Sequence, residues 1–230
     1  MSWGMGNVGG GSGLGSAFAV IAVTYPAGST CTCTKGTRTL RAKDTSGAYL
    51  FAIPEAGTWT VSCTDGTEAA SVNVVINSQY QVEKAFLQYE LVLFDGSSGG
   101  DNTSITGGWE KLRGTLNVTE TEIRFASGES ASRSSAYTKN AIPLYGYSRI
   151  DFTGYTESAS PGSACQYLIA TSKTNDTSGT IATINSPHFT SGTVSIDLSG
   201  LNLSPSISYY IGLSNNSRNS PTFLTKCIVV

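Results

Sequence analysis

Apolar and polar residues alternate along the first part of the chain, and turn residues interrupt the alternation at short intervals. A period of two is typical of strands that bury one face. Between Ala17 and Phe86 it predicts about seven short strands, of which Phe18–Tyr25 and Thr58–Cys63 are the clearest. Asp65-Gly66 favours a tight hairpin turn. About seven strands in about seventy residues indicate a small β-sandwich of Ig-like or prealbumin-like type.

A second series of strand-like segments follows the loop Asp95–Asn102, which is rich in Gly, Ser and Asp. No long amphipathic segment separates these strands, and a parallel α/β fold needs helices in those places. The pattern therefore predicts a larger, jelly-roll-like β-sandwich, so that the whole chain is all-β. The expected strands are Trp109–Leu112, Thr115–Val118, Glu122–Phe125, Ser135–Tyr137, Ser148–Thr153, Gln166–Thr171, Thr193–Leu198, Tyr209–Leu213 and Phe223–Val229.

Residues 80–94 fit two patterns. Their apolar residues recur near the helical spacing, and from Leu87 to Leu93 they also alternate as in a strand. We interpret the segment as two strands that meet near Leu87 and Gln88, because Tyr, Val and Phe favour sheets. The predicted organisation is then a flexible leader with seven glycines over residues 1–16, a first sandwich over 17–87 and a second over 88–230.

Composition narrows the classes of partner. Hydrophobic residues make up 39% of the chain, which is enough for real cores, but charged residues make up only 13%, about half the usual share. The formal net charge is -2, and the densest basic stretch, Lys35–Lys43, is spaced like the solvated face of a strand pair. We therefore expect no nucleic-acid partner, because phosphate binding needs a denser basic patch.

The cysteines and the start of the chain indicate a compartment. Ala17–Val23 is apolar but far shorter than the ~20 residues that span a bilayer, and no basic segment precedes it as in a signal peptide. We expect neither membrane insertion nor export, and synthesis in a cytoplasm. The five cysteines are an odd number without CxxC spacing, and the single His188 lies far away. Buried reduced thiols therefore fit better than a disulfide framework or a zinc site.

Residues suited to catalysis are scarce. His188 has no carboxylate partner nearby in sequence, and no GxSxG motif is present, although triad members can be far apart in a chain. A pair of carboxylates for glycoside cleavage would have to come from Glu110, Glu120, Glu122, Glu129, Asp151 and Glu157. Of these, Glu120 and Glu122 would lie on one strand face. They are equally the charged outer face of an edge strand, where charges discourage aggregation. We predict that the chain is not an enzyme.

Two sets of residues are candidates for binding. Tyr145, Tyr147 and Tyr155 lie at or near turns, where aromatic rings are available to stack on sugar rings, whereas most other aromatic residues are expected in the core. The loop Asp95–Asn102 offers side-chain oxygens, on Asp95, Asp101 and Asn102, that suit a calcium ion. Its spacing does not match the EF-hand, and such loops are also common as simple linkers.

One passage carries a resemblance to a known type of module. Gly47–Ser62 combines aromatic residues on one strand face, a Pro-x-x-Gly turn and a returning Trp-Thr-Val strand. In this it resembles the carboxypeptidase-regulatory-like and PEGA-like sandwiches, over roughly residues 18–87. The resemblance implies a spacer or interaction module without catalytic residues.

The chain also resembles, loosely, the tail-associated proteins of tailed phages and prophages. The features it shares with them are the Gly-rich start Met1–Leu14, the sandwich that follows and the Thr106-Gly-Gly-Trp109 entry to a Ser/Thr/Gly-rich segment. This resemblance implies a virion structural or host-surface-binding protein, made without a signal peptide. Its partners would be other virion proteins or a host cell-surface glycan, and it would be able to form a homo-oligomer. The alternative is a bacterial carbohydrate-binding module used for adhesion at the cell surface.

Overall fold

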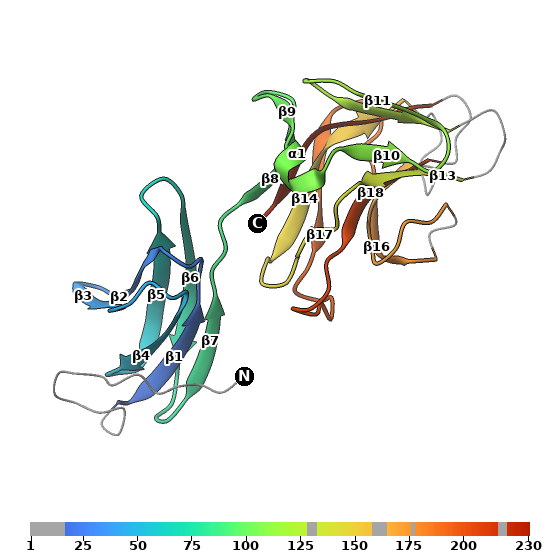
Figure 1. Cartoon of the computed structure of the whole chain (residues 1–230). Helices are drawn as coiled ribbons and strands as arrows, with labels where there is room; N and C mark the ends of the chain where they lie inside the picture. Colours follow the sequence, from blue (N-terminus) through green and yellow to red (C-terminus); the bar gives the residue numbers. More distant parts are fainter. Residues whose placement is uncertain (1–16, 128–132, 158–164, 176–177, 216–219) are drawn as a thin grey trace. The chain divides into compact units, whose positions relative to one another are not determined.

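The structure is a computed structural model that describes residues 17–127, 133–157, 165–175, 178–215 and 220–230. The described residues divide into two compact units, one ending at Tyr89 and the other beginning at Glu90 (Figure 1). The predicted flexible leader over residues 1–16 lies outside the described residues. The first unit ends slightly later than the predicted boundary at Leu87. The Tyr89 hydroxyl is hydrogen-bonded to Ser29 Oγ at 2.5 Å. This hydrogen bond holds residues 88 and 89 to the first unit.

The first unit is a sandwich of a three-stranded and a four-stranded sheet. The strand orders are β4-β1-β7 and β3-β2-β5-β6. In the first sheet β1 pairs antiparallel with β4 and parallel with β7. The strands are β1 (Ala19–Thr24), β2 (Thr30–Lys35), β3 (Arg38–Arg41), β4 (Ala48–Ile53), β5 (Gly57–Thr64), β6 (Ala69–Ile76) and β7 (Val82–Phe86).

The core of this unit follows the predicted alternation. Phe51, Ile53, Trp59 and Val61 are all 2% exposed or less, so the strands on both sides of the Pro54–Gly57 turn bury the same core. Trp59 is the largest of these side chains, and its indole Nε1 donates to the carbonyl of Glu55 at 3.2 Å. A buried Trp needs such an acceptor for its N–H, and here the turn provides it.

The second unit is a larger sandwich. One sheet has the order β10-β13-β18-β15-β16, and the other has the order β11-β12-β19-β14-β17. In the second sheet β8 also pairs with β19, and β9 pairs with β8. Its elements are β8 (Leu91–Asp95), β9 (Gly100–Asp101), α1 (Thr103–Thr106), β10 (Trp109–Lys111), β11 (Thr115–Val118), β12 (Ile123–Ala126), β13 (Ser134–Thr138), β14 (Arg149–Thr156), β15 (Cys165–Ala170), β16 (Thr180–Asn185), β17 (Gly192–Asp197), β18 (Tyr210–Asn215) and β19 (Thr222–Val229).

The two sheets of the second unit meet through a stacked aromatic pair. Phe152 on β14 and Tyr167 on β15 are both 0% exposed, and their ring centroids lie 4.8 Å apart with an interplanar angle of 3°. The Tyr167 hydroxyl donates to the carbonyl of Phe223 on β19 at 2.8 Å. Strand β14 lies between β17 and β19, and its pairing with β19 shifts register at Thr153/Gly154.

Two sequence interpretations can be compared directly with these elements. Residues 80–94 form two strands, β7 and β8, and no helix, as the preferred interpretation predicted. Glu120 and Glu122, in contrast, do not share a strand face. They lie in the turn between β11 and β12, which the hydrogen bond from Thr119 N to the Glu122 carbonyl closes at 2.9 Å.

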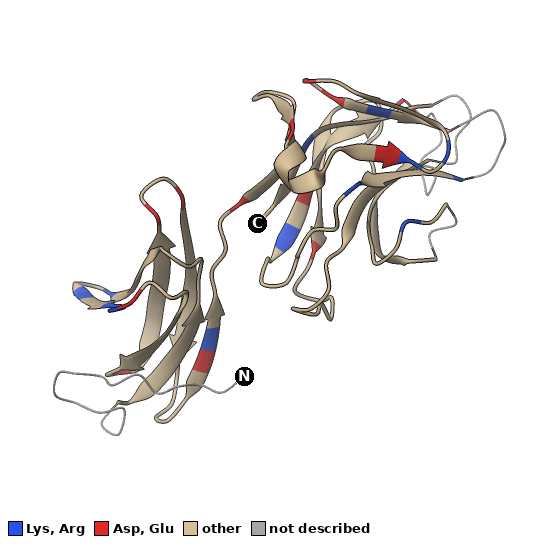
Figure 2. Ribbon diagram, viewed as in Figure 1, with Lys and Arg blue, Asp and Glu red and all other residues tan. Residues whose placement is uncertain are grey.

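Charged side chains are sparse and scattered over both units (Figure 2). The basic stretch on the β2–β3 hairpin is partly neutralised, because Lys35 and Arg38 lie 3.4 Å and 3.7 Å from the Glu55 carboxylate. Within the residues that the structure describes, no helix is both long enough and apolar enough to cross a bilayer.

Candidate functional site

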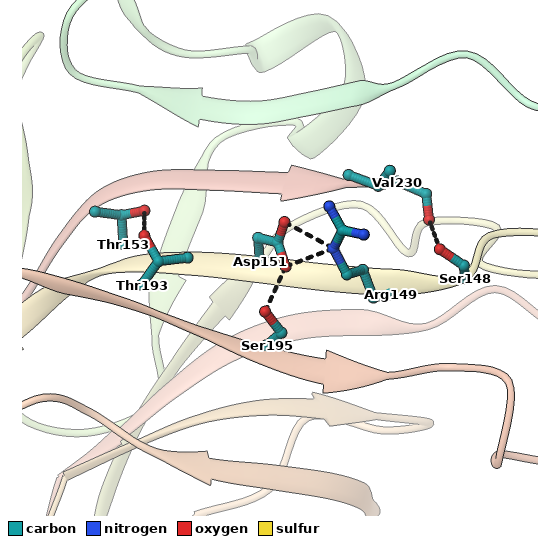
Figure 3. A network of polar contacts seen from close by, with 7 residues as sticks. All are labelled: Ser148, Arg149, Asp151, Thr153, Thr193, Ser195 and Val230. Carbon is teal, nitrogen blue, oxygen red and sulfur yellow. Dashed lines mark hydrogen bonds and ion pairs between the residues drawn. The ribbon is translucent and has the colours of Figure 1, made fainter. Parts of the chain in front are cut away.

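The outer surface of the β14 region carries a row of polar side chains. Alternation along β14 directs Ile150 and Phe152 into the core, where both are 0% exposed, and leaves the residues between them on the outside. We call this surface the β14 face. It comprises Arg149, Asp151, Thr153 and Tyr155 of β14 together with Thr193 and Ser195 of β17. Figure 3 shows these residues except Tyr155.

Asp151 is the centre of this face. Its carboxylate accepts hydrogen bonds from Arg149 Nε at 3.1 Å and 3.0 Å and from Ser195 Oγ at 2.6 Å. The Asp151 side chain is 18% exposed and that of Arg149 is 50% exposed, so the pair is ordered yet reachable from solvent. Further along the face, the Thr153 and Thr193 hydroxyls lie 2.8 Å apart. The face therefore presents fixed donors and acceptors before any ligand arrives.

An aromatic pair stands at the far end of β14. Tyr155 is stacked on Phe223, with centroids 4.5 Å apart and an interplanar angle of 9°, and the Arg124 guanidinium lies 5.9 Å from the Phe223 centroid. Burial raises the pKa of Tyr155, and nearby Glu122 and Glu157 raise it further. The Tyr155 hydroxyl therefore stays protonated at neutral pH and can donate a hydrogen bond.

Phe189 is a second aromatic residue at this end, and sequence reasoning missed it. It is 63% exposed, its amide donates to the Thr156 carbonyl at 2.9 Å, and His188 beside it forms a bridge with Thr156. The φ angle of Phe189 is 57°. A bulky residue in this left-handed region costs about 1–3 kcal/mol, and such strain concentrates at functional sites. The only sequence signal was a Phe close to a Pro in a loop.

The three tyrosines of the sequence-based platform are not brought together. Tyr145 is 38% exposed, and Tyr147 packs partly against the core, both in the turn before β14. Tyr155 lies near the opposite end of β14, an eight-residue strand that spans about 25 Å at ~3.3 Å per residue. Only Tyr155 belongs to the β14 face as defined above.

The three candidate calcium ligands do not converge either. Asp101 pairs with Phe94 and Gly100 pairs with Asp95 in the β8–β9 hairpin, so the two carboxylates point to opposite sides of it. Asp101 Oδ1 accepts from Thr106 Oγ1 at 2.7 Å, and Asn102 Oδ1 accepts from Ser104 at 2.6 Å. Among the residues that are described, no group of three or more His, Cys, Asp or Glu side chains is arranged to hold a metal. Calcium binding stays a prediction that a metal titration tests.

Asp95 instead holds its own loop to β19. Its Oδ1 accepts from Ser97 Oγ at 2.6 Å, and its Oδ2 lies 3.0 Å from Lys226 Nζ. The hydrogen bond from the Ser97 hydroxyl, and after it that from Lys226, holds the pKa of Asp95 well below its ordinary value. These contacts stabilise the carboxylate form of Asp95 in the folded protein. In the unfolded chain the contacts are absent, and Asp95 is protonated at its ordinary pKa of about 3.9.

This lowered pKa predicts an acid-sensitive second unit. A carboxyl group whose pKa is lowered on folding adds stability above its unfolded pKa and loses it as the pH falls. We expect the free energy of unfolding of the second unit to decrease when the pH is lowered below about 5. In the Asp95→Asn variant we expect a lower free energy of unfolding at pH 7 and a smaller decrease of that energy as the pH is lowered. Unfolding by urea at a series of pH values measures both, and identical pH profiles for the two proteins would rule out this role for Asp95.

Comparisons with known proteins add resemblance but no family. No family model matches the chain, and no curated protein matches it. Solved structures that resemble it include a carbohydrate-binding module of the β-sandwich superfamily, at 13% identity and a TM-score of 0.37, covering 86% of this chain and 83% of that one. The family 11 carbohydrate-binding module from Clostridium thermocellum, in complex with a β-1,3-1,4-mixed-linked tetrasaccharide, has 13% identity and a TM-score of 0.41, with 61% and 95% covered.

A family 29 carbohydrate-binding module from Piromyces equi is a third such structure, with 10% identity, a TM-score of 0.38, and 61% and 88% covered. These neighbours are carbohydrate-binding β-sandwiches. With TM-scores below 0.5, the likeness to these three structures is distant. Nothing in the comparisons points to a phage tail protein, so the resemblance to tail-associated proteins receives no support from them.

Proposed function

We propose that the chain is a non-catalytic carbohydrate-binding protein and that glycans bind along the β14 face. The observation that carries this proposal is the ordered Arg149–Asp151–Ser195 network on an open strand surface. It is supported by the exposed Phe189 and the stacked Tyr155 at one end of the same strand.

The chemistry of this face suits sugars. A sugar presents hydroxyl groups that both donate and accept hydrogen bonds, and charged partners make the stronger ones. Asp151 can accept from such hydroxyls and the half-exposed Arg149 can donate to them. Because the two side chains are already ordered by each other, binding loses less side-chain entropy than it would with free chains. An exposed aromatic ring adds apolar contact with the C–H groups of a sugar ring.

The shape of the face favours an extended glycan. Its groups lie along β14 from Arg149 to Tyr155, over about 20 Å at ~3.3 Å per residue. That distance is longer than one sugar ring, so we infer that the ligand is an oligosaccharide with several units in contact.

The same contacts support a binding role without catalysis. Hydrolysis of a glycosidic bond normally needs two carboxyl groups that flank it, one of which donates a proton. On the β14 face the Asp151 carboxylate is bonded to a guanidinium and a hydroxyl. Glu120 and Glu122, the pair considered from sequence, both lie in the β11–β12 turn. Glu122 is near Tyr155 at the end of the face, whereas Asp151 lies between Ser195 and Ile228.

A glycan array followed by calorimetric titration tests the proposal. We expect the full chain to bind at least one oligosaccharide on the array, and Phe189→Ala and Asp151→Asn each to weaken that binding about tenfold. Loss of an aromatic contact or of one charged hydrogen bond has about this size, 1–2 kcal/mol.

Tyr80→Ala is the matched control for Phe189→Ala. Tyr80 is also an exposed aromatic residue with positive φ, at 77% exposure and 64°, but it lies in the first unit. We expect the Tyr80→Ala variant to bind the oligosaccharide with the affinity of the wild type. Absence of any glycan hit, or hits that neither Phe189→Ala nor Asp151→Asn weakens, would refute glycan binding at this face.

A further inference from the structure

Three of the five cysteines gather in the core of the first unit. Cys31 and Cys33 on β2 and Cys63 on β5 are each 1% exposed or less, and all are free thiols. Cys31 and Cys63 are direct cross-strand partners in the antiparallel β2–β5 pair. Partners in such a pair point to the same side of the sheet, so both thiols face the same core.

The backbone hydrogen bonds around Cys31 show whether Cys31 and Cys63 form a hydrogen-bonded or a non-hydrogen-bonded antiparallel pair. The Cys31 carbonyl accepts from Ala42 N at 3.0 Å, so the backbone polar groups of Cys31 point toward β3 and away from β5. Its pair with Cys63 is therefore a non-hydrogen-bonded pair. The β5–β6 hairpin agrees, because Asp65 N donates to the Glu68 carbonyl, which makes Cys63 a hydrogen-bonded partner of Ala70 on the opposite side.

This kind of pair brings two side chains to bonding range. The two Cα atoms of a non-hydrogen-bonded antiparallel pair lie about 4.5 Å apart, within the range of about 4.4–6.8 Å that disulfides allow. We propose that Cys31 and Cys63 are a latent cross-strand disulfide site, which closes when a disulfide oxidant such as oxidised glutathione is present during folding.

No other pair of cysteines in the chain offers this placement. Cys33 lies opposite Val61 on β5 and opposite Leu40 on β3. In the second unit Cys165 lies opposite Asn215, and Cys227 opposite Phe152 and Phe94. One disulfide and three thiols are therefore the expected oxidised state.

The reaction is two successive thiol–disulfide exchanges. The Cys31 thiolate attacks oxidised glutathione and releases one glutathione thiolate, which leaves a mixed disulfide on Cys31. The Cys63 thiolate then attacks the Cys31 sulfur and releases the second glutathione thiolate. Two protein thiols are oxidised, one glutathione disulfide is reduced, and the protons of both thiols pass to the solvent or to the released glutathione.

Burial determines when this reaction is fast. Burial, and after it the neighbouring Cys63, raises the pKa of Cys31 to about 11. The folded protein therefore holds almost no reactive thiolate at neutral pH. Closure is expected while the unit folds, when the thiols are still exposed, and the finished core then resists both oxidation and reduction.

Refolding the full chain with and without oxidised glutathione tests the proposal. After refolding, free thiols are alkylated under denaturing conditions and the peptides are mapped by mass spectrometry. We expect one predominant linked peptide pair, Cys31 with Cys63, and alkylated Cys33, Cys165 and Cys227. We also expect a higher denaturant midpoint for the first unit, because the bond closes a long loop of the unfolded chain.

Cys33→Ala and Cys63→Ala make the assignment specific. The first variant should keep the Cys31–Cys63 bond, and the second should leave Cys31 and Cys33 both alkylated. Soluble, refolded wild-type protein in which Cys31 and Cys63 are both alkylated would overturn the proposal. A wild-type map in which Cys33 is linked as often as Cys31 would also overturn it, and neither result depends on a variant that folds.

Discussion

Gly154→Ala should destabilise the second unit by about 3 kcal/mol or more, the upper end of what overpacking a core costs. Gly154 is buried on β14 at the register shift with β19. A methyl group added there would overlap the carbonyl oxygen of Phe223 and the hydroxyl of Tyr167. Those two atoms are hydrogen-bonded to each other in the core, so neither can move aside without breaking that bond. We therefore expect β14 and β19 to separate locally and glycan binding to be lost with them.

Gly192→Ala is the matched control. Gly192 lies directly opposite Gly154 on β17, but a methyl group there would meet only the Pro187 side chain, at an ordinary contact distance of 3.5 Å. We expect a change in stability below about 1 kcal/mol. Urea unfolding, monitored by hydrogen exchange at the amides of each unit, measures the stability of the second unit in both variants. Equal stability of the two variants would show that the close approach at Gly154 is not a constraint.

Trp59→Ala should remove most of the stability of the first unit. Trp59 is 0% exposed in its core, and truncating a buried Trp or Phe costs about 3–5 kcal/mol. A unit of about 70 residues has a total of only about 4–10 kcal/mol at 0.05–0.15 kcal/mol per residue. The amides of the first unit should then exchange rapidly with solvent, while those of the second unit stay protected.

Val75→Ala is the control that separates the loss of buried Trp59 from a general effect of truncating any strand residue on the stability of the first unit. Val75 lies on the neighbouring strand β6 and is 49% exposed, so its truncation removes little buried surface. We expect a change within about 0.5 kcal/mol. Hydrogen exchange measured by mass spectrometry distinguishes the two variants, and protected first-unit amides in Trp59→Ala would contradict the role given to Trp59.

The fold could be predicted to a large extent because alternation leaves a clear record in the sequence. Strands that bury one face, such as β5 and β14, alternate strongly and were recognised. The bounds of β5 were predicted to within one residue, whereas the predicted β14 ended at Thr153 and the observed strand continues to Thr156. Strand β16 (Thr180–Asn185) was missed because it is an edge strand that pairs only with β15. Its residues alternate between half-buried and exposed, and Ile181 is 37% exposed, so no strongly buried face marks it.

The candidate site could be predicted only in part, because its geometry depends on pairing between distant strands. Tyr155 was identified as an aromatic residue available for binding. Asp151 and Ser195 lie far apart in the sequence and meet only through the β14–β17 register. The prominence of Phe189 follows from a backbone conformation that no composition rule indicates for a bulky residue.

The Asp95–Asn102 loop shows the same difficulty for a metal site. Its oxygen-bearing residues are close in sequence, and that closeness suggested calcium. The hairpin pairing sends Asp95 and Asp101 to opposite sides, where Lys226 and Thr106 bind them. Proximity in sequence is a poor guide inside a hairpin, because consecutive side chains alternate sides.

Amide chemical-shift mapping is the most direct test of a glycan site on the β14 face. The full chain, isotopically labelled, would be titrated with the oligosaccharide that gives the strongest signal on the array. We predict that the shifted amides cluster on β14, on β17 and around Phe189, and that Asp151→Asn reduces the shifts at equal ligand concentration. Shifts confined to the first unit, or to the turn that carries Tyr145, would contradict a binding site on this face.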